Sequence, residues 1–262
     1  MATDRGWHPL VEGCPPEWAS GWGEDVFGVF VEFRVGAVEQ RMRWIRPGQF
    51  MMGSPVGEQG RDDGDEGQHS VTLTRGYWLA DTPVTQALWE AVLGENPSKF
   101  QGDTRRPVEQ VSWHDCQRLC VRLGERVAGP AFRLPTEAEW EYACRAGTTE
   151  ATYAEALKQK LDDIAWYNDN SQRKTHAVKA KLANQWGLHD MLGNVWEWCS
   201  DWYSSDSSAA QQDPAGPATG GIRVLRGGSW GYGARRVRAA CRGRLDPGVR
   251  YVLLGLRLVR DQ

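Results

Sequence analysis

The stretch GGSWGYGARRVRAACRGRLDPGVRYVLLGLRLVRDQ, residues 227–262, sets arginines at irregular intervals among small and apolar residues. Between Gly221 and Gln262 there are ten arginines and no lysine, and the only acidic residues are Asp246 and Asp261. This segment therefore carries a charge of +8, which leaves −11 for the rest of a chain whose net charge is −3. Because the arginines are spread through apolar sequence, the pattern favours a network that pairs with the acidic body over nucleic-acid binding. We expect no nucleic-acid partner.

Length and composition describe a loop-rich chain. Its 262 residues can bury a full core as one large domain or two small ones. The 30 glycines, 13 prolines and 14 tryptophans indicate irregular backbone held by aromatic packing. The sequence shows neither the basic and apolar regions of a secretory signal nor an apolar run of transmembrane length. We therefore expect a cytoplasmic protein that does not insert into membranes.

The six cysteines are too sparse for a disulfide scaffold, so we expect mostly reduced thiols at Cys14, Cys116, Cys120, Cys144, Cys199 and Cys241. Cys116 and Cys120 lie four residues apart on a predicted helix, a spacing that allows a shared metal. No second closely spaced Cys/His pair completes a zinc site, which favours two small buried hydrophobes instead.

Local patterns predict short elements. Residues 26–35 predict a strand, and residues 40–54 predict two strands about a Pro47-Gly48 turn. Residues 57–69 are acidic and glycine-rich, which indicates a solvated loop. Residues 84–94 predict a helix that ends at Gly94 and faces inward through Ala87, Leu88, Val92 and Leu93.

Capping-box patterns predict two further helices. One begins at Ser112 with Asp115, and the other begins at Thr136 with Glu139 and ends at Gly147. No long helix is expected beyond residue 148. We assign residues 1–36 to an N-terminal appendage or linker with a strand, and residues 37–262 to one domain.

Several long, aromatic stretches occur in a recognisable order: WIRPGQFMMGS, PVTQALWEAV, NPSKF, RPVEQVSWHDC, RLPTEAEWEYACRAG, WGLHDMLGNVWEWCSDWY and RVLRGGSW. Together they resemble the signatures of the formylglycine-generating-enzyme (sulfatase-modifying factor) family, from about Arg41 to Arg260. The resemblance implies an α+β, C-type-lectin-like fold. Such a fold has a small twisted antiparallel sheet, two main helices and much ordered loop.

Fold alone does not give function, so the active residues need separate comparison. The family's oxidases use a cysteine pair after GGS-aromatic to bind copper, and the matching positions here are Tyr232 and Val237. Neither supplies a thiolate, and Cys241 fits neither position. Related iron-dependent sulfoxide synthases need an extra histidine-bearing helical bundle. The histidines of this chain are scattered singly, at His8, His69, His114, His176 and His189. We expect no catalytic residues, no copper and no enzymatic activity.

Residues 227–260 resemble, more narrowly, the variable region of diversity-generating-retroelement variable proteins. In that family an error-prone reverse transcriptase randomises the adenines of a template repeat and writes the copy into the gene. The resemblance implies a bacterial or phage gene and a hypervariable, non-enzymatic protein that binds macromolecular, protein ligands. It places the varied, ligand-binding positions at Gly231, Tyr232, Gly233, Arg236, Cys241, Gly243, Leu245, Val249, Tyr251, Val252 and Leu253.

The genetic code provides an independent check. Randomising the adenines of AAC gives NNC codons, which cannot encode Lys, Glu, Gln, Met or Trp. None of the eleven positions carries one of these five residues. Since the five make up about a fifth of average usage, chance alone gives this result about 5–10% of the time.

A binding surface of this kind needs a backbone whose fold does not depend on the varied side chains. Tyr251 to Leu253 are then expected on an exposed apolar patch, while Leu254, Leu256 and Leu258 belong to a core strand. The alternative is that all of them are core. Two other functions stay open, namely an oxidase with relocated thiols and a carbohydrate-binding lectin module.

Residues 190–198, DMLGNVWEW, match a loop that binds calcium in the first family. The resemblance places the ligands at the Asp190 and Glu197 carboxylates and the Gly193 and Val195 carbonyls. Hard oxygen ligands on a tight glycine loop suit a structural Ca²⁺. The alternative is a metal-free loop held by Asn194 hydrogen bonds and by packing of Trp196 and Trp198.

Overall fold

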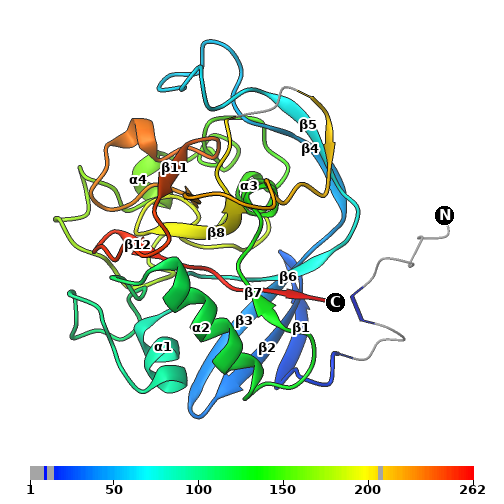
Figure 1. Cartoon of the computed structure of the whole chain (residues 1–262), viewed down its shortest axis with the longest axis vertical. Coiled ribbons are helices and arrows are strands. Elements are labelled where there is room, and N and C mark those ends of the chain that lie inside the picture. Colours follow the sequence, from blue (N-terminus) through cyan, green and yellow to red (C-terminus); the bar gives the residue numbers. More distant parts are fainter. Residues whose placement is uncertain (1–8, 11–14, 206–208) are drawn as a thin grey trace.

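Strands from both ends of the chain share one sheet in the computed structural model, which describes residues 9–10, 15–205 and 209–262 (Figure 1). The order of this antiparallel sheet is β1 (Gly21–Asp25), β2 (Gly28–Val35), β3 (Val38–Ile45), β6 (Tyr77–Ala80), β13 (Val259–Asp261) and β7 (Phe132–Arg133). The histidine at position 8 and the cysteine at position 14 lie outside the described residues. The α+β, C-type-lectin-like fold class is confirmed.

Two smaller sheets complete the strand structure. One has the order β11 (Arg242–Leu245), β10 (Arg223–Arg226), β8 (Trp196–Trp202) and β12 (Leu254–Gly255), in which β12 runs parallel to β8. The other has the order β4 (Gly48–Met52), β5 (His69–Leu73) and β9 (Gln211–Gln212). The sheet structure is therefore larger than the single small antiparallel sheet that we expected.

The N-terminal strands are part of the six-stranded sheet. β2 pairs with β3 from Phe30 to Val35, and the boundary expected between residues 36 and 37 falls in the turn of this hairpin. Val31 and Phe33 on β2 are fully buried in the main core. Residues 21–35, which we assigned to an N-terminal appendage or linker with a strand, therefore pair with the sheet and pack in its core. The division of the chain between residues 36 and 37 stays a prediction.

The helices are α1 (Gln86–Leu93), α2 (Trp113–Gly124), α3 (Glu137–Arg145) and the single turn α4 (Leu161–Ile164). Both predicted capping boxes are present. The Ser112 hydroxyl accepts from the Asp115 amide at the start of α2, and Thr136 makes the same bond to Glu139 at the start of α3. Such caps stabilise a helix by about 1 kcal/mol each.

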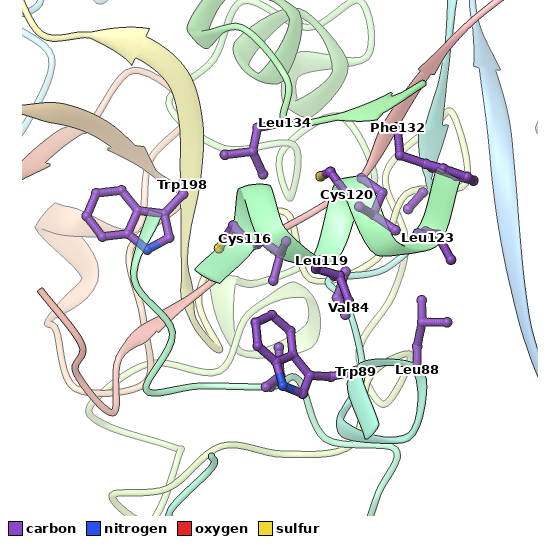
Figure 2. Close-up of a cluster of buried hydrophobic side chains, with 14 of the residues drawn as sticks. Val84, Leu88, Trp89, Cys116, Leu119, Cys120, Leu123, Phe132, Leu134 and Trp198 are labelled. Atoms are coloured by element: carbon purple, nitrogen blue, oxygen red, sulfur yellow. The ribbon is translucent and has the colours of Figure 1, made fainter. Parts of the chain in front are cut away.

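Helices α1 and α2 pack on each other beside the six-stranded sheet and form much of the main core (Figures 1 and 2). Cys116 and Cys120 lie in this core as small hydrophobes, as expected, and burial raises the pKa of the Cys120 thiol to about 12. The inward residues of α1 are Leu88, Val92 and Trp89, whereas Ala87 and Leu93 are only half-buried. Trp89, outside the expected inward set, is 1% exposed and belongs to the main core.

No helix in the described part of the chain is long and apolar enough to cross a membrane.

The four-stranded sheet is the element that positions the candidate site. Its central strands are β8 and β10. Strand β11 pairs with β10 and strand β12 pairs with β8, so the two parts of the C-terminal segment that form β11 and β12 are held by one sheet.

Candidate ligand-binding surface

The eleven predicted varied positions fall into three groups by exposure. Five side chains or backbone positions are exposed, at Gly231, Tyr232, Gly233, Arg236 and Tyr251. Four more are half-buried, at Gly243, Leu245, Val249 and Val252. Nine of the eleven therefore face the surface wholly or in part.

Two of the eleven positions are buried, whereas we expected the varied positions at the surface. Cys241 is 0% exposed and Leu253 is 8% exposed, and both belong to the main core. The Cys241 carbonyl accepts a hydrogen bond from the buried Arg226 at 2.6 Å. Leu253 is buried but still lines the pocket that is described next.

Six of the eleven positions meet in this one pocket, which has a volume of about 290 Å³. They are Tyr232, Arg236, Gly243, Leu245, Tyr251 and Leu253. The remaining wall comes from positions outside the predicted set, namely Asp62, Asp65, Trp196, Leu225, Arg242, Arg244 and Leu254. The pocket thus combines predicted varied positions with residues outside the predicted set.

Trp196 lines the pocket and contacts a predicted varied position. It begins β8, and its ring meets the Tyr232 ring edge to face with centroids 5.7 Å apart. A Cβ atom added at Gly243 would lie 3.3 Å from the Trp196 ring and 3.1 Å from the Leu225 side chain. The absence of a side chain at Gly243 therefore keeps this side of the pocket open.

Main-chain hydrogen bonds hold the varied segments in place. The Tyr232 carbonyl accepts from the Asn168 amide at 2.9 Å, and the Tyr251 carbonyl accepts from the Gln110 amide at 3.0 Å. The Trp230 indole donates to the Val252 carbonyl at 3.1 Å. Because these bonds use backbone atoms of the varied positions, they do not depend on which side chains those positions carry.

The turn before the pocket requires glycine. Gly227 and Gly228 have φ values of 98° and 72°, a region that favours glycine. A Cβ at Gly228 would lie 2.6 Å from the Arg236 carbonyl oxygen. The GGS turn therefore lets residues 231–236, which include a short 3₁₀ turn (Ala234–Arg236), fold back closely on the scaffold.

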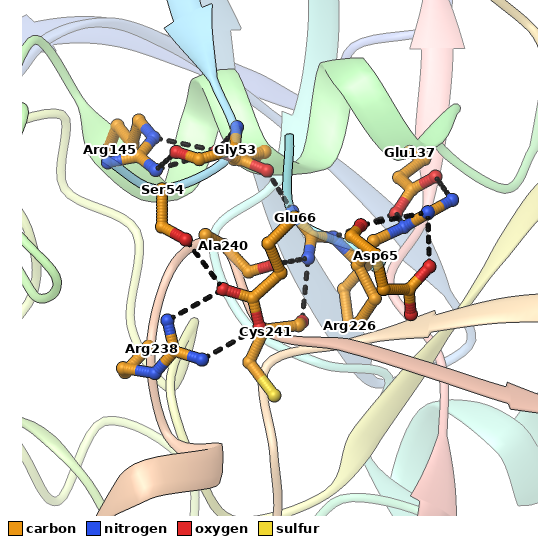
Figure 3. Close-up of polar contacts among 12 residues, drawn as sticks. Gly53, Ser54, Asp65, Glu66, Glu137, Arg145, Arg226, Arg238, Ala240 and Cys241 are labelled. Carbon is orange, nitrogen blue, oxygen red and sulfur yellow. Dashed lines mark hydrogen bonds and ion pairs between the residues drawn. The ribbon is translucent and has the colours of Figure 1, made fainter. Parts of the chain in front are cut away.

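Buried arginines of the C-terminal segment bond to carboxylates and carbonyls from other parts of the chain (Figure 3). Arg226 pairs with Glu141 and donates to the carbonyls of Ala240 and Cys241. Arg238 pairs with Glu66 at 2.7 Å and with Glu58. The predicted network between the arginine-rich segment and the acidic body is confirmed.

Arg242 extends the network to α3. It donates to Glu137 at 2.7 Å and to Asp65 at 2.8 Å. Burial would raise the pKa of Glu137, but the charges of Arg242 and Arg226 outweigh it and lower that pKa. Asp65 and Glu66 come from the loop that we expected to be solvated. Both are buried, because each supplies a carboxylate to an arginine.

The positions that match the oxidase cysteines carry no thiol. Tyr232 lies on the rim of the pocket, and the Val237 side chain is fully buried. Burial raises the pKa of the nearby Cys241 thiol, which disfavours the reactive thiolate. The described cysteines are all free and buried.

The predicted calcium ligands do not fit a calcium site in this arrangement. Glu197 pairs with Arg257 at 2.9 Å and accepts from the Trp140 indole at 2.7 Å. Asp190 accepts from the Asn194 side chain at 3.1 Å and from the Lys179 amide at 2.9 Å. Arg257 thus supplies the positive charge that a cation would supply. The geometry matches the metal-free alternative, in which Asn194 holds the loop.

Sequence reasoning missed the scaffold half of the pocket. Trp196 was assigned only to packing within its loop, and Arg242 only to the arginine network. No short-range pattern could have placed Asp62 or Asp65 there, because Asp65 and Arg242 are 177 positions apart in the sequence.

Known protein families and solved structures include relatives of this chain. The sequence pattern of the sulfatase-modifying factor enzyme 1-like domain matches residues 27–262. Treponema denticola variable protein 1 superposes with a TM-score of 0.78 and 35% identity, over 88% of this chain and 98% of that one. PvdO from Pseudomonas aeruginosa superposes with a TM-score of 0.75 and 25% identity, over the same shares.

The formylglycine-generating enzyme of Mus musculus is 33% identical over 210 residues, which cover 74% of this chain and 53% of the mouse protein. The chain thus matches about half the length of that enzyme. These likenesses confirm both resemblances that the sequence carries, to the sulfatase-modifying factor family and to variable proteins.

Proposed function

The chain belongs to the sulfatase-modifying factor enzyme 1-like family, and we propose that in this member the fold binds ligands and catalyses no reaction. The proposed binding surface consists of residues 231–236 and 243–253 and is centred on the pocket that Trp196 and Tyr232 share. We propose that a retroelement diversifies this surface, so that related copies bind different macromolecular, protein targets.

The convergence of six predicted varied positions on one pocket carries this proposal. The resemblance to variable proteins implies the eleven positions, and they are spread over 23 residues of chain, from Gly231 to Leu253. These positions lie together next to a backbone that arginine ion pairs hold in place, as a binding surface that tolerates changes of side chain requires. The similarity to a variable protein over nearly the whole domain supports the same function.

Two alternatives receive less support. An oxidase with relocated thiols would need an accessible thiolate, whereas Cys241 is fully buried and burial raises its pKa. A calcium-dependent lectin would need carboxylates open to sugar hydroxyls, whereas Asp190 and Glu197 are buried and bonded to protein donors. Nucleic-acid binding is disfavoured because most of the C-terminal arginines are paired or buried.

The DNA that flanks the gene tests the diversification. We expect a near-copy of the segment that encodes residues 227–260, with AAC or AAT at the codons of the eleven positions and a reverse-transcriptase gene nearby. A flanking region without such a repeat would contradict the proposal that this surface is hypervariable.

A further inference from the structure

The pocket is small, which restricts its occupant. Its 290 Å³ lies at the lower edge of the range of about 300–1,000 Å³ that is usual for whole small-molecule ligands. Protein interfaces, in contrast, commonly place one anchoring side chain into a pocket of the partner. Size therefore favours a single side chain as the occupant.

The lining of the pocket defines the polarity of that side chain. The aromatic and aliphatic surface of the pocket comes from Tyr232, Tyr251, Leu245, Leu253 and Trp196. Tyr232 and Tyr251 are 40% and 54% exposed, so part of this apolar surface is open to a partner. Burial of the exposed parts against an apolar side chain would be favourable at roughly 25 cal/mol per Å².

Charge on the rim favours an acidic neighbour. Asp65 is already bonded to Arg242 and to the Tyr203 hydroxyl, so its charge is matched inside the protein. Arg236 is exposed, lies near the Cys241 thiol, and forms no ion pair within residues 15–205 and 209–262. An exposed guanidinium of this kind can pair bidentately with a carboxylate.

We propose that this pocket receives one aromatic or aliphatic side chain of a partner protein, flanked by a carboxylate that pairs with Arg236. Gly243 determines the specificity, because any side chain there would enter the space between Leu225 and Trp196. The inference rests on the proposed function. It adds the chemical class of the occupant and the residue that selects for it.

A phage-displayed library of random peptides, selected on the immobilised full chain, provides the probe. Recovered peptides should carry an apolar residue next to Asp or Glu, and replacing that apolar residue with Ala in the peptide should weaken binding about tenfold or more. Gly243→Val should cause a similar loss. Gly221→Val is the matched control and should bind normally, because Gly221 is exposed, lies outside the proposed binding surface, and a Cβ there meets nothing within 4 Å.

A second pair of variants tests the charge. Arg236→Glu should weaken binding about tenfold, whereas Arg75→Glu, at an exposed arginine outside the proposed binding surface, should leave binding unchanged. Thermal melts establish that each variant is folded. If Gly243→Val does not fold, Gly243→Ala and the peptide substitutions decide the outcome.

The possible results separate the two proposals. If no recovered peptide loses binding in the Tyr232→Ser/Tyr251→Asp double variant, the surface is not a binding site and the proposed function fails. If peptides depend on those tyrosines but bind Gly243→Val as well as they bind Gly221→Val, the surface function stands and the pocket inference is wrong. Equal effects at Arg236 and Arg75 overturn the pairing with a carboxylate.

Discussion

The Tyr232 ring meets the Trp196 ring edge to face, with centroids 5.7 Å apart and planes at 83°. This contact joins a position expected to vary to a residue of the β8 scaffold that is 5% exposed. The tryptophan presents a flat apolar wall that many different side chains at position 232 can contact. The relationship therefore explains how the surface can change while the support under it does not.

Polar replacement of the exposed tyrosines should leave the fold intact. For Tyr232→Ser combined with Tyr251→Asp we expect a loss of about 1 kcal/mol or less in the free energy of unfolding, because both side chains are largely exposed. Leu256→Ala, a fully buried position, should cost about 2–5 kcal/mol. Denaturant unfolding measures both. A double variant as unstable as Leu256→Ala would mean that these tyrosines are core.

Loss of a buried arginine should be far more damaging than loss of an exposed one. Arg238→Ala would leave the buried carboxylates of Glu58 and Glu66 without their cation and should cost about 3–5 kcal/mol. Arg235→Ala, on the exposed side of the same turn, should change stability by about 0.5 kcal/mol or less. Similar melting temperatures for the two variants would contradict the scaffold role of the arginine network.

Asp201 should make stability fall with rising pH. Burial, with a contribution from the nearby Glu137 and Glu139 charges, raises the pKa of Asp201 to about 7. The folded state therefore binds a proton that the unfolded state, with a pKa near 3.8, releases earlier. The stability is fully present below the unfolded pKa and is lost as the pH rises through about 7.

The Asp201→Asn variant isolates this effect. Its free energy of unfolding relative to the parent chain should increase steadily between those two pKa values, because the amide cannot ionise. Asp169→Asn, at an exposed position, serves as the control and should show no such trend. A pH-independent difference for Asp201→Asn would contradict the raised pKa.

Calcium should not stabilise the protein. Glu197 is paired with Arg257, and Asp190 accepts from Asn194 and Lys179, so neither carboxylate is available to an added cation. We expect the same melting temperature in excess EGTA and in millimolar CaCl₂. A higher melting temperature in calcium would restore the site that the family resemblance implied.

The protein should form no formylglycine. A sulfatase peptide that contains the substrate cysteine is incubated with the purified chain, with and without copper, and analysed by mass spectrometry. The formylglycine-generating enzyme of Thermomonospora curvata, a relative 35% identical over 171 residues, provides the positive control. Product above the no-enzyme background would overturn the proposal that Tyr232 and Val237 replace a catalytic thiol pair.

Local sequence determined the parts of this protein that depend on near neighbours. The capping boxes at Ser112 and Thr136 formed as predicted, because a cap needs only a hydroxyl and an acid three residues away. The absence of thiols at positions 232 and 237 was likewise plain from the chain. The charge balance of residues 221–262 also predicted that the arginines would pair with acids elsewhere.

Only the tertiary structure decided which acids those were and which varied positions reach the surface. Arg238 meets Glu66 across 172 residues of chain, and no periodicity encodes such a pairing. Cys241 and Leu253 looked like their exposed neighbours in sequence, yet both are buried. The physical reason is that burial in irregular loops is fixed by long-range packing and hydrogen bonding, whereas caps and turns are fixed within a few residues.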